Sequence, residues 1–298
     1  MYKRQGYGLT SGLESLDVRE IELWKQSIGA GNLYINRPTT GAIVLRQPFG
    51  GVGLSAYGPG VKAGGPNYVL ALMKVNDGRP NSNESTAPHD ELDRLQSWVE
   101  VFAATDVMPE AVAASLRSVM TSQRSAMAQE FSREHDSVKL VGQDNFRRYR
   151  PVKAMTIRVD SADQIVDALT AVTAAVAAGA QVTVSISTDL SPQAKELLES
   201  PADYVPGLVD PVEETIDELA KRIRDGGVNR LRLFDQRKDH AELLKACGEM
   251  FVTSISEPVV VEGRVECLRY MDEQSVSHDY HRYGNLGRRA EETRRPVG

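Results

Sequence analysis

The 298-residue sequence has little cysteine, no long apolar run and no excess of positive charge. Its two cysteines, Cys247 and Cys267, lack CxxC spacing, so the sequence indicates neither a disulfide framework nor a zinc site. No stretch approaches the ~18 consecutive apolar residues of a transmembrane helix. The net charge of −6 argues against a general nucleic-acid binder, which shows a basic face or stripe. We therefore expect a cytoplasmic protein with no membrane span and no nucleic-acid partner.

The composition that is present is typical of a globular protein. Hydrophobic residues make up 41% of the chain, which suffices for buried cores, and the length suits roughly two domains by the ~150-residue prior. The one basic cluster, Gly287–Arg295, is predicted to be a solvated tail. The charged start Met1–Gln5 has no apolar run behind it, so it lacks the pattern of a signal peptide, and we interpret it as a ragged beginning.

The first part of the chain is predicted to hold one helix and one strand before a linker. Asp17-Val18-Arg19-Glu20 is a capping-box-like start, and apolar residues at helical spacing follow until glycines end the helix. The strand Leu33–Ile35 comes next. Asn76–Asn83 is polar and rich in turn formers, which is typical of a linker. Two helices are then expected, at Asp90–Phe102 and at Pro109–Arg133, the second with Pro109 in its first turn.

From Val152 onward, strand-like and helix-like segments alternate, which predicts a mostly parallel sheet covered by helices on both faces. The expected strands are Val152–Val159, Gln181–Ser187, Arg230–Phe234 and Met250–Ile255. The expected helices are Ser161–Ala178, one after Ser191-Pro192, Val212–Arg224 and Asp239–Cys247.

The last strand-like pair is predicted to be different. Glu257–Val261 and Arg264–Tyr270 flank the turn-forming pair Glu262-Gly263, which favours a β-hairpin. We expect this hairpin to project from the sheet as a flap or to pair with another chain.

The most unusual segment is Gly31–Pro66, which has nine glycines within 36 residues. Glycine is used where φ must be positive or where a ligand or another chain approaches the backbone, so the segment indicates a surface shaped for contact. Its pieces NLYIN, TTGAIVLRQPFGG, GLSAYGPG and KAGGPNY, with Gly6–Leu13 before them, are specific. They resemble the end of the catalytic domain of an aldehyde dehydrogenase, in particular L-glutamate γ-semialdehyde (pyrroline-5-carboxylate) dehydrogenase. The resemblance runs from Gly6 to about Tyr68.

That resemblance implies an activity and also a missing part. Members of the family carry several hundred residues before this point, including the NAD-binding domain, the nucleophilic cysteine and the general-base glutamate. The resemblance therefore implies a C-terminal fragment with no catalytic or cofactor-binding residue of its own, inactive alone. The parent enzyme would use NAD to oxidise glutamate semialdehyde to glutamate in proline catabolism, through a cysteine thiohemiacetal and hydrolysis of the resulting thioester.

A second, less specific resemblance covers most of residues 139–287. Val141–Tyr149, Glu273–Ser277 and His281–Gly287 are similar to the extra C-terminal domain of the longer bifunctional proline utilization A enzymes. Those enzymes fuse an FAD-dependent proline dehydrogenase to the semialdehyde dehydrogenase. The resemblance implies a non-catalytic, Rossmann-like domain that helps to cover an internal tunnel, and a homo-oligomeric parent enzyme.

Together these patterns predict an α/β fold: the truncated end of an aldehyde dehydrogenase catalytic domain, then a Rossmann-like α/β domain with a β-hairpin flap. The predicted division is 1–76 for the aldehyde dehydrogenase part, 77–138 for linker and helices, and 139–298 for the Rossmann-like domain. Apolar surface around Leu33–Leu45 is expected to be exposed where it faces the missing part.

The resemblance also implies three substrate-binding residues. In the family, backbone amides of a tight turn hold the distal carboxylate of the substrate, and an aromatic ring packs on its aliphatic chain. Gly41 and Ala42 occupy the turn positions here, and Phe49 the aromatic one. Exposed N–H groups in a glycine turn form an anion-binding concavity, which suits that role. The alternative is that Gly41 only makes a turn and Phe49 only fills a core. Some relatives have serine in place of Ala42, so only the backbone contact carries over.

Two segments, one rich in glycine and one rich in carboxylates, argue against dinucleotide binding by this chain. Gly51–Ala56 satisfies GxGxxA, but Pro48 before it and Gly58-Pro59-Gly60 after it do not suit the strand and helix that the fingerprint requires. After the predicted strand Val152–Val159 comes Asp160-Ser161-Ala162-Asp163, where a phosphate would meet carboxylates.

Other candidates for chemistry are weaker. His278, Asp279 and His281 offer two imidazoles and a carboxylate to a metal, but a polar terminal segment explains them more simply. Cys247 and Cys267 are predicted to be small buried apolar residues, Cys267 within a strand. The alternative to the enzyme fragment is that residues 139–298 form a stand-alone, non-catalytic assembly module. An independent small enzyme would need a ligand site that the sequence does not show.

Overall fold

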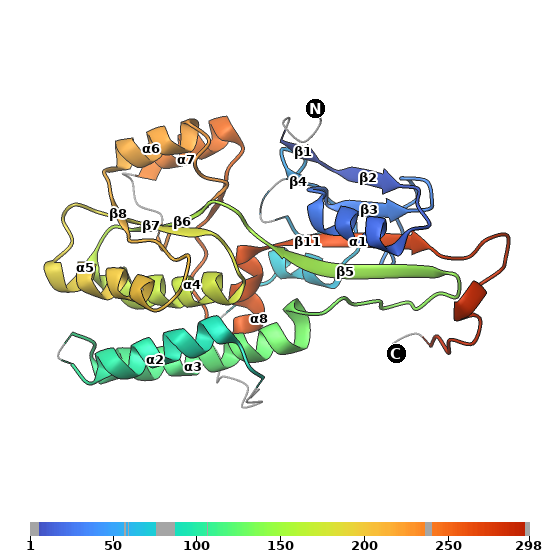
Figure 1. The fold of residues 1–298 in the computed structure, drawn as a ribbon. Coiled ribbons are helices and arrows are strands. Elements are labelled where there is room, and N and C mark those ends of the chain that lie inside the picture. The colour runs from blue at the N-terminus through green and yellow to red at the C-terminus, as the bar shows by residue number, and fades with distance from the viewer. Residues whose placement is uncertain are drawn as a thin grey trace. The chain divides into compact units, whose positions relative to one another are not determined.

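The computed structural model describes residues 6–56, 58, 60–75, 87–105, 107–235 and 240–295, which form two compact units (Figure 1). Unit 1 is drawn from Met1–Lys74, Ser132–Arg150 and Asp272–Gly298, and unit 2 from Val75–Phe131 and Pro151–Met271. Each unit is thus discontinuous in sequence. The division into 1–76, 77–138 and 139–298 stays a prediction about the linear chain, and the predicted linker Asn76–Asn83 lies outside the described residues.

Unit 1 is built around a four-stranded sheet in the order β2-β3-β11-β5. The strands are β2 (Thr10–Leu13), β3 (Asn32–Ile35), β5 (Gln143–Pro151) and β11 (Met271–Asp279). Both β2 and β11 run parallel to β3, so that Thr10 and Ser275 both pair with Asn32. A short antiparallel pair, β1 (Tyr7–Gly8) with β4 (Val52–Gly53), lies apart from this sheet. The predicted strand at Leu33–Ile35 is confirmed.

The helix of unit 1 is α1 (Val18–Ser27), and its ends explain its length. Asp17 is the N-cap, and its side chain accepts a hydrogen bond from the Arg19 amide. At the other end, Arg148 and Arg150 of β5 donate to the carbonyls of Lys25 and Gln26, 2.7 and 3.0 Å away. Guanidinium groups therefore satisfy carbonyls that the last turn leaves open. The predicted helix is confirmed, with Asp17 as its cap.

The apolar core of unit 1 lies between α1 and the sheet and is small. It consists of Ile21, Ala30, Leu33, Ile35 and Val276, with partly buried Leu13, Trp24, Ile28 and Phe146 packed against it. The prediction of exposed apolar surface around Leu33–Leu45 is confirmed for the later part of that stretch and wrong for its start. Leu33, Tyr34 and Ile35 are buried in β3, and only the later part of that stretch is exposed.

The Arg-rich C-terminal segment of unit 1 is folded back, so the predicted solvated tail is wrong in part. Arg289 and Arg294 both bind the carboxylate of Asp144 on β5, and Arg294 also binds Asp136. Arg289 stacks over the Tyr280 ring at 3.7 Å. Burial raises the pKa of the Asp144 carboxyl, but hydrogen bonds from both arginines outweigh it and lower that pKa overall. Because Asp144 is buried, these two arginines are structural partners of β5.

Unit 2 contains a five-stranded sheet in the order β10-β9-β6-β7-β8, and every pair in it is parallel. Its strands are β6 (Met155–Val159), β7 (Val182–Ile186), β8 (Val212–Glu213), β9 (Arg230–Arg232) and β10 (Thr253–Ile255). In chain order the sheet therefore runs 3-2-1-4-5, as in a doubly wound Rossmann-like fold. The predicted parallel sheet is confirmed.

Helices cover both faces of this sheet, as predicted. Figure 1 shows α6 and α7 on one face and α4 and α5 on the other, with α2 and α3 as a further layer against α4. The helices are α2 (Asp90–Ala103), α3 (Glu110–Ala126), α4 (Ile165–Ala177), α5 (Pro192–Glu199), α6 (Ile216–Arg224) and α7 (Ala241–Met250). Ten consecutive residues of α4 are buried because sheet and helices enclose it on opposite sides.

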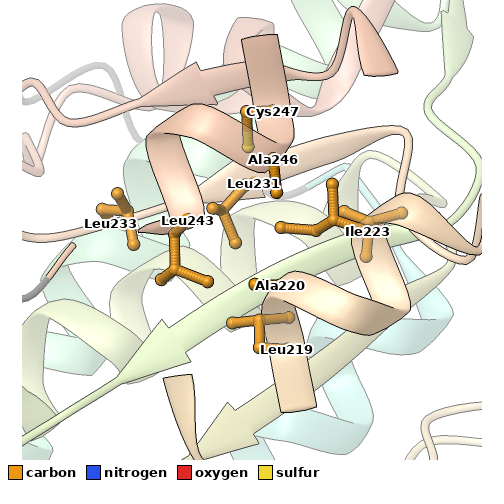
Figure 2. Close-up of a cluster of buried hydrophobic side chains, with 9 residues drawn as sticks. Leu219, Ala220, Ile223, Leu231, Leu233, Leu243, Ala246 and Cys247 are labelled. Carbon is orange, nitrogen blue, oxygen red and sulfur yellow. The ribbon is translucent and has the colours of Figure 1, made fainter. Parts of the chain in front are cut away.

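One core cluster of unit 2 shows how the strands and helices interlock (Figure 2). Leu219 and Ile223 of α6 and Leu243 of α7 meet Leu231 of β9, and all four are at most 1% exposed. This is the packing expected of an amphipathic helix pair on a buried strand.

The predicted β-hairpin at Glu257–Tyr270 is wrong. The residues form a short helix, α8 (Gly263–Glu266), followed by a 3₁₀ turn at Cys267–Tyr270. Glu262 caps α8 by accepting from the Arg264 amide. A Cβ at Gly263 would lie 2.5 Å from the Gln123 backbone, so α8 packs directly on α3. Tertiary contact with α3 decides the conformation here, and the strand-like alternation of the sequence does not.

Several predicted boundaries shift for local reasons. The strand expected at Val152–Val159 begins at Met155, because Ala154 has φ +53°. The helix expected at Val212–Arg224 begins at Ile216, where Thr215 and Glu218 form a capping box. Pro109 precedes α3 as its N-cap residue instead of lying in its first turn.

Candidate functional site

The predicted substrate-binding residues lie on one loop of unit 1, between β3 and β4. The backbone turns left-handed immediately after β3, at Asn36, where φ is +56°. It does so again at Gly41, with φ +79°, and at Leu45, with φ +61°. A non-glycine residue rarely adopts such angles, so Gly41 suits the conformation that the turn requires. We call residues 36–50 the anchor loop.

The backbone amides of Gly41 and Ala42 face open surroundings. Both residues are exposed, and a Cβ added at Gly41 would meet nothing within 4 Å. Within the part of the chain that the structure describes, neither N–H donates a hydrogen bond, whereas the next amide, that of Ile43, donates to Gln47 at 3.0 Å. Two adjacent unpaired N–H groups in a glycine turn are suited to binding an anion.

Gln47 fixes the anchor loop to the sheet beneath it. Its side chain is 2% exposed, and its amide nitrogen donates to Asn145 of β5 and to Ser277 of β11. Its carbonyl oxygen accepts the Ile43 amide. The amide nitrogen and the carbonyl oxygen of the Gln47 side chain are therefore both hydrogen-bonded, and they link the turn to two strands of the sheet.

Two arginines add positive charge to the anchor loop. The Arg37 guanidinium donates to Ser277 and lies 5.4 Å from the centre of the Tyr34 ring. Arg46 donates to Gln143 of β5 at 2.9 Å. Both bind neutral partners in these contacts, so their charge is left to favour an anion near the loop.

Phe49 closes the loop. Its backbone forms an antiparallel bridge with Ala63, with N–H to O distances of 2.9 and 3.0 Å. Its side chain is 36% exposed, so the ring presents apolar surface and is not buried in a core. Gly41, Ala42 and Phe49 thus share one loop, and their role in binding a substrate stays a prediction.

A buried lysine supports the loop next to Phe49. Lys62 is fully buried, and its ammonium group donates to the carbonyl of Gly50, which also accepts from Asn32. Glu273 of β11 accepts the Lys62 backbone amide and the Asn67 side chain. Burial lowers the pKa of Lys62 to about 8, although the negative charge of Glu273 opposes that shift.

Sequence reasoning missed these supporting residues. Gln143, Asn145, Glu273 and Ser277 lie on two strands that were not predicted as strands, because their sequences are polar and do not alternate in hydrophobicity. Two short polar motifs in the sequence could have indicated these residues: GQDNF at Gly142–Phe146 and EQSVS at Glu273–Ser277. A run of small and amide side chains within a buried strand indicates hydrogen-bonding partners inside the unit.

The GxGxxA segment Gly51–Ala56 has a different structure from a dinucleotide fingerprint. Val52–Gly53 is the two-residue strand β4, antiparallel to β1, and a turn follows it at Leu54-Ser55. A Cβ at Gly51 would lie 2.1 Å from the Ser55 carbonyl, so this glycine permits a tight turn. Of the neighbouring residues, Tyr57 and Pro59 lie outside the described part of the chain.

The switch point of the Rossmann-like sheet does not fit NAD. In this fold a dinucleotide binds where the strand order reverses, at the carboxyl ends of β6 and β9. Asp160 occupies that place after β6, bound by Arg158 at 2.7 Å and by His240 at 2.8 Å. Burial raises the pKa of the Asp160 carboxyl, but hydrogen bonds from His240 and Arg158 lower it overall, so it is a carboxylate. It would repel a pyrophosphate, and the β6–α4 turn has no glycine to cradle one.

The remaining candidates show no metal or thiol chemistry among the described residues. No group of three metal-ligating side chains gathers there, and His278 lies on β11 with its Nε2 3.4 Å from Asn36. Cys247 is buried on α7, as predicted, and Cys267 is buried in the 3₁₀ turn instead of a strand. Burial raises the pKa of both thiols, that of Cys247 to about 11. None of the described helices is long and apolar enough to span a membrane.

Comparison with known proteins confirms the first resemblance. The model of the aldehyde dehydrogenase family matches residues 3–77. The chain is 56% identical to the bifunctional protein PutA of Rhizobium meliloti over 68 residues. These residues are 23% of this chain and 5% of that protein. It is 47% identical to the 1-pyrroline-5-carboxylate dehydrogenase of Bacillus subtilis over 69 residues. These residues are 23% of this chain and 13% of that enzyme. The matched segment is thus a small part of each relative.

Comparison of structures extends the likeness to nearly the whole chain. A proline utilization A (PutA) structure from Corynebacterium freiburgense covers 94% of this chain with a TM-score of 0.66 and 29% identity, and the match spans 24% of that protein. The α/β fold, like that of aldehyde dehydrogenase structures, is therefore confirmed. The chain spans about a quarter of that structural relative.

Proposed function

We propose that this chain is the C-terminal portion of an NAD-dependent aldehyde dehydrogenase that oxidises L-glutamate γ-semialdehyde to L-glutamate in proline catabolism. Support comes from residues 3–77, which match the aldehyde dehydrogenase family. It also comes from the names of the relatives, a 1-pyrroline-5-carboxylate dehydrogenase and a bifunctional PutA protein. By the same proposal the parent enzyme is a cytoplasmic homo-oligomer.

The observation that carries the proposal is the pair of unpaired amides at Gly41 and Ala42. Glutamate semialdehyde differs from a simple aldehyde by its α-amino-carboxylate end. We propose that this carboxylate accepts hydrogen bonds from the two amides, with the positive charge of Arg37 and Arg46 close by. Hydrogen bonds to a charged group contribute about 1.5–3 kcal/mol each, which is enough to select a carboxylate-bearing aldehyde.

Phe49 has a separate role in the proposal. Its partly exposed ring supplies the apolar surface that would pack on the methylene groups between the carboxylate and the aldehyde. Its backbone bridge to Ala63, and the Lys62 contact on the adjacent Gly50, hold it in one place. A fixed ring lowers the entropy lost when the substrate binds.

The reacting groups have to come from other residues of the parent enzyme. Cys247 and Cys267 lie in unit 2 and are buried, and the pKa of about 11 for Cys247 leaves almost no thiolate at neutral pH. The switch point of unit 2 holds its own buried carboxylate where NAD would place its pyrophosphate. We therefore propose that unit 2 is non-catalytic and structural, consistent with a tunnel-covering domain, and that the chain alone is inactive.

The test uses a fusion in which this chain replaces the matching 69 residues of the Bacillus subtilis 1-pyrroline-5-carboxylate dehydrogenase. Ala42→Pro removes one anchoring N–H, and it should raise the KM for glutamate semialdehyde by about 10- to 100-fold. The KM for butanal, which has no carboxylate, should stay within about twofold because that substrate does not use the anchor. Initial rates of NADH formation measure both.

Ala42→Ser is the matched control, because it changes the side chain at the same position and keeps the N–H. It should raise neither KM value, and a lower KM for glutamate semialdehyde alone would come from the added hydroxyl group. Unchanged butanal turnover also shows that the proline variant is folded. If Ala42→Pro raises both KM values alike, or neither, the amides do not anchor the substrate and the proposed role of the loop is wrong.

A further inference from the structure

Strand β11 has one apolar face and one polar face. Successive side chains of a strand point to opposite sides of the sheet, so Ser275 and Ser277 share one face and Val276 lies on the other. Val276 belongs to the apolar core between α1 and the sheet. The two serines are at most 2% exposed, and both form hydrogen bonds with the anchor loop. The polar face of β11 therefore holds that loop.

The hydroxyl group of Ser277 joins three other side chains. It accepts hydrogen bonds from Arg37 at 2.6 Å and from Gln47 at 3.2 Å. It donates to Asn145 of β5 at 2.9 Å. A hydroxyl group has one proton to donate and two lone pairs that accept, so Ser277 uses its full hydrogen-bonding capacity. Since a buried polar group is costly to leave unpaired, these side chains fix one another in place.

Ser277 determines where the Arg37 guanidinium lies. Among the described residues this guanidinium donates no other hydrogen bond and forms no ion pair, and its Nε is buried without a partner. It also lies 5.4 Å from the centre of the Tyr34 ring. Without the Ser277 hydroxyl group, no hydrogen bond would hold the positive charge of Arg37 at the start of the anchor loop.

Ser277 also acts on the anchor amides, through Gln47. The Gln47 side chain accepts the Ile43 amide at 3.0 Å. Ile43 directly follows the two residues with unpaired amides, Gly41 and Ala42. The place of the Gln47 side chain therefore sets the direction of the turn, and the Ser277 hydroxyl group helps to fix that place. One buried hydroxyl group thus constrains both the amides and the positive charge that are proposed to meet a carboxylate.

Ser275 provides a comparison within the same strand. Its hydroxyl group donates to the carbonyl of Pro48, the residue before Phe49. Ser275 therefore holds the end of the loop that carries the aromatic ring, whereas Ser277 holds the part that carries the anchor amides. Both serines lie beyond residues 3–77, the segment that matches the aldehyde dehydrogenase family, so the match assigns a role to neither.

We infer that Ser277 is a positioning residue for carboxylate recognition by the anchor loop. Its hydroxyl group acts through other side chains: it orients Arg37 and Gln47, and through Gln47 the two amides. The inference rests on the proposed function for the identity of the ligand, a carboxylate-bearing aldehyde. It adds the residue on which the preference for that carboxylate depends.

Ser277→Ala tests the inference in the fusion with the Bacillus subtilis enzyme described above. The KM for glutamate semialdehyde should rise about 3- to 10-fold, and the KM for butanal should stay within about twofold, because only the first substrate uses the carboxylate anchor. Ser275→Ala is the matched control, because it removes a buried hydroxyl group from the same face of the same strand. It should leave the ratio of the two KM values within about twofold, since both aldehydes have methylene groups for the Phe49 end of the loop.

Amide hydrogen exchange in the full chain, followed by nuclear magnetic resonance, needs no catalysis. In Ser277→Ala the Ile43 amide should exchange about 3- to 10-fold faster, because its acceptor Gln47 is held less firmly. The Ser275 amide donates to the Gly31 carbonyl, so unchanged exchange at Ser275 shows that the sheet is intact.

Ser277→Cys is the second variant, for the case in which Ser277→Ala loosens the sheet. A thiol occupies the place of the hydroxyl group but is only a weak donor and acceptor. It should raise the ratio of the two KM values in the same direction as Ser277→Ala.

The outcomes separate this inference from the proposed function. An active fusion in which neither Ser277 variant changes the ratio of KM values keeps the proposed function and rejects the inference. Equal ratios for Ser277→Ala and Ser275→Ala reject it as well, because the hydroxyl group would then have only a structural role. A fusion that does not oxidise glutamate semialdehyde, with faster exchange at Ile43 in Ser277→Ala, rejects the proposed substrate and keeps Ser277 as the residue that positions the anchor amides.

Discussion

The two units of this chain bury different kinds of residues. In unit 2 the strand β6 is buried over its whole length, because helices cover both faces of its sheet. In unit 1 the strand β11 buries Glu273, Gln274, Ser275 and Ser277, and a lysine is fully buried beneath the anchor loop. Unit 1 also carries most of the exposed large hydrophobic side chains among the described residues. Unit 2 has the apolar interior that is typical of a globular domain, whereas unit 1 has a largely polar interior and exposed apolar side chains.

That difference indicates which unit is the more stable by itself. A domain is stabilised chiefly by the apolar area it removes from water, and unit 2 removes much more of it per residue. Unit 1 depends on hydrogen-bonded polar groups, each of which contributes little beyond replacing its contacts with water. We therefore expect unit 2 to unfold cooperatively by itself and unit 1 to be the less stable body. Trp24 lies in unit 1 and Trp98 in unit 2, so fluorescence follows one unit alone when the other tryptophan is replaced by phenylalanine.

The largest expected effect comes from a buried charge in unit 2. Glu266 is fully buried, and it accepts hydrogen bonds from Arg269 at 2.6 Å and from Tyr270 at 2.9 Å, with Arg232, also fully buried, at 3.4 Å. Glu266→Ala leaves the Arg232 charge without its carboxylate. The free energy of unfolding of unit 2 should fall by about 3–5 kcal/mol, measured by urea titration of Trp98 fluorescence.

The control for that prediction is an exposed ion pair in the same unit. Glu249 binds Arg224 at 2.7 Å, and the two side chains are 42% and 34% exposed to solvent. Glu249→Ala should cost at most about 1 kcal/mol because water screens the pair. Equal effects of the two substitutions would show that unit 2 does not hold Glu266 in a dry interior.

The same chemical change in the two units should give different results. Leu231 lies in the unit 2 cluster of Figure 2 and is fully buried, whereas Leu72 of unit 1 is 81% exposed. Leu231→Ala should lower the free energy of unfolding of unit 2 by about 2–5 kcal/mol, because it removes buried methyl groups and leaves a cavity.

Leu72→Ala should change the stability of the isolated chain by less than about 0.5 kcal/mol. Chemical denaturation of both variants, followed at Trp98 and Trp24 respectively, makes the comparison. A large loss of stability from Leu72→Ala in the isolated chain would mean that the Leu72 side chain is packed, and the contrast between the units would disappear.

Unit 2 was predicted well from the sequence because its strands and helices are apolar segments that alternate along the chain. β6 and α4, both predicted, are buried over consecutive residues. The hairpin failed where a tertiary contact decides. Gly263 lets α8 lie on the backbone of Gln123, and no property of the local sequence shows that partner.

Unit 1 was less predictable for a related reason. The polar strands β5 and β11 give no periodic signal, and β11 lies beside β3 although paired residues such as Ser275 and Asn32 are 243 positions apart in the sequence. The turn at Gly41 was identified through the family resemblance, and its φ of +79° agrees with the positive φ that the glycine-rich segment indicates. Its supports, Gln47 and Lys62, were not found, because a buried polar side chain is recognised by its partners and not by its own residue type.

The last prediction sharpens the comparison at the candidate site itself. Burial lowers the folded-state pKa of Lys62 to about 8, below the ordinary lysine value of 10.5. Between those pH values the unfolded chain binds a proton that the folded chain has released, so the stability of unit 1 should rise with pH. The rise is at most about 3 kcal/mol. Unfolding followed at Trp24 in a Trp98→Phe background, at pH 7, 8, 9 and 10, measures it.

Two variants isolate Lys62 from the other groups that titrate in that range. Lys62→Met fills similar space without a charge, so its stability relative to the parent should fall steadily as pH rises from 8 to 10. Lys139→Met, at an exposed lysine of the same unit, should stay parallel to the parent. Parallel curves for both variants would mean that Lys62 is solvated at neutral pH. Its ammonium group would then not be the buried support of Gly50 and Phe49, and the anchor loop would have to be held by Gln47 and the two strands beneath it.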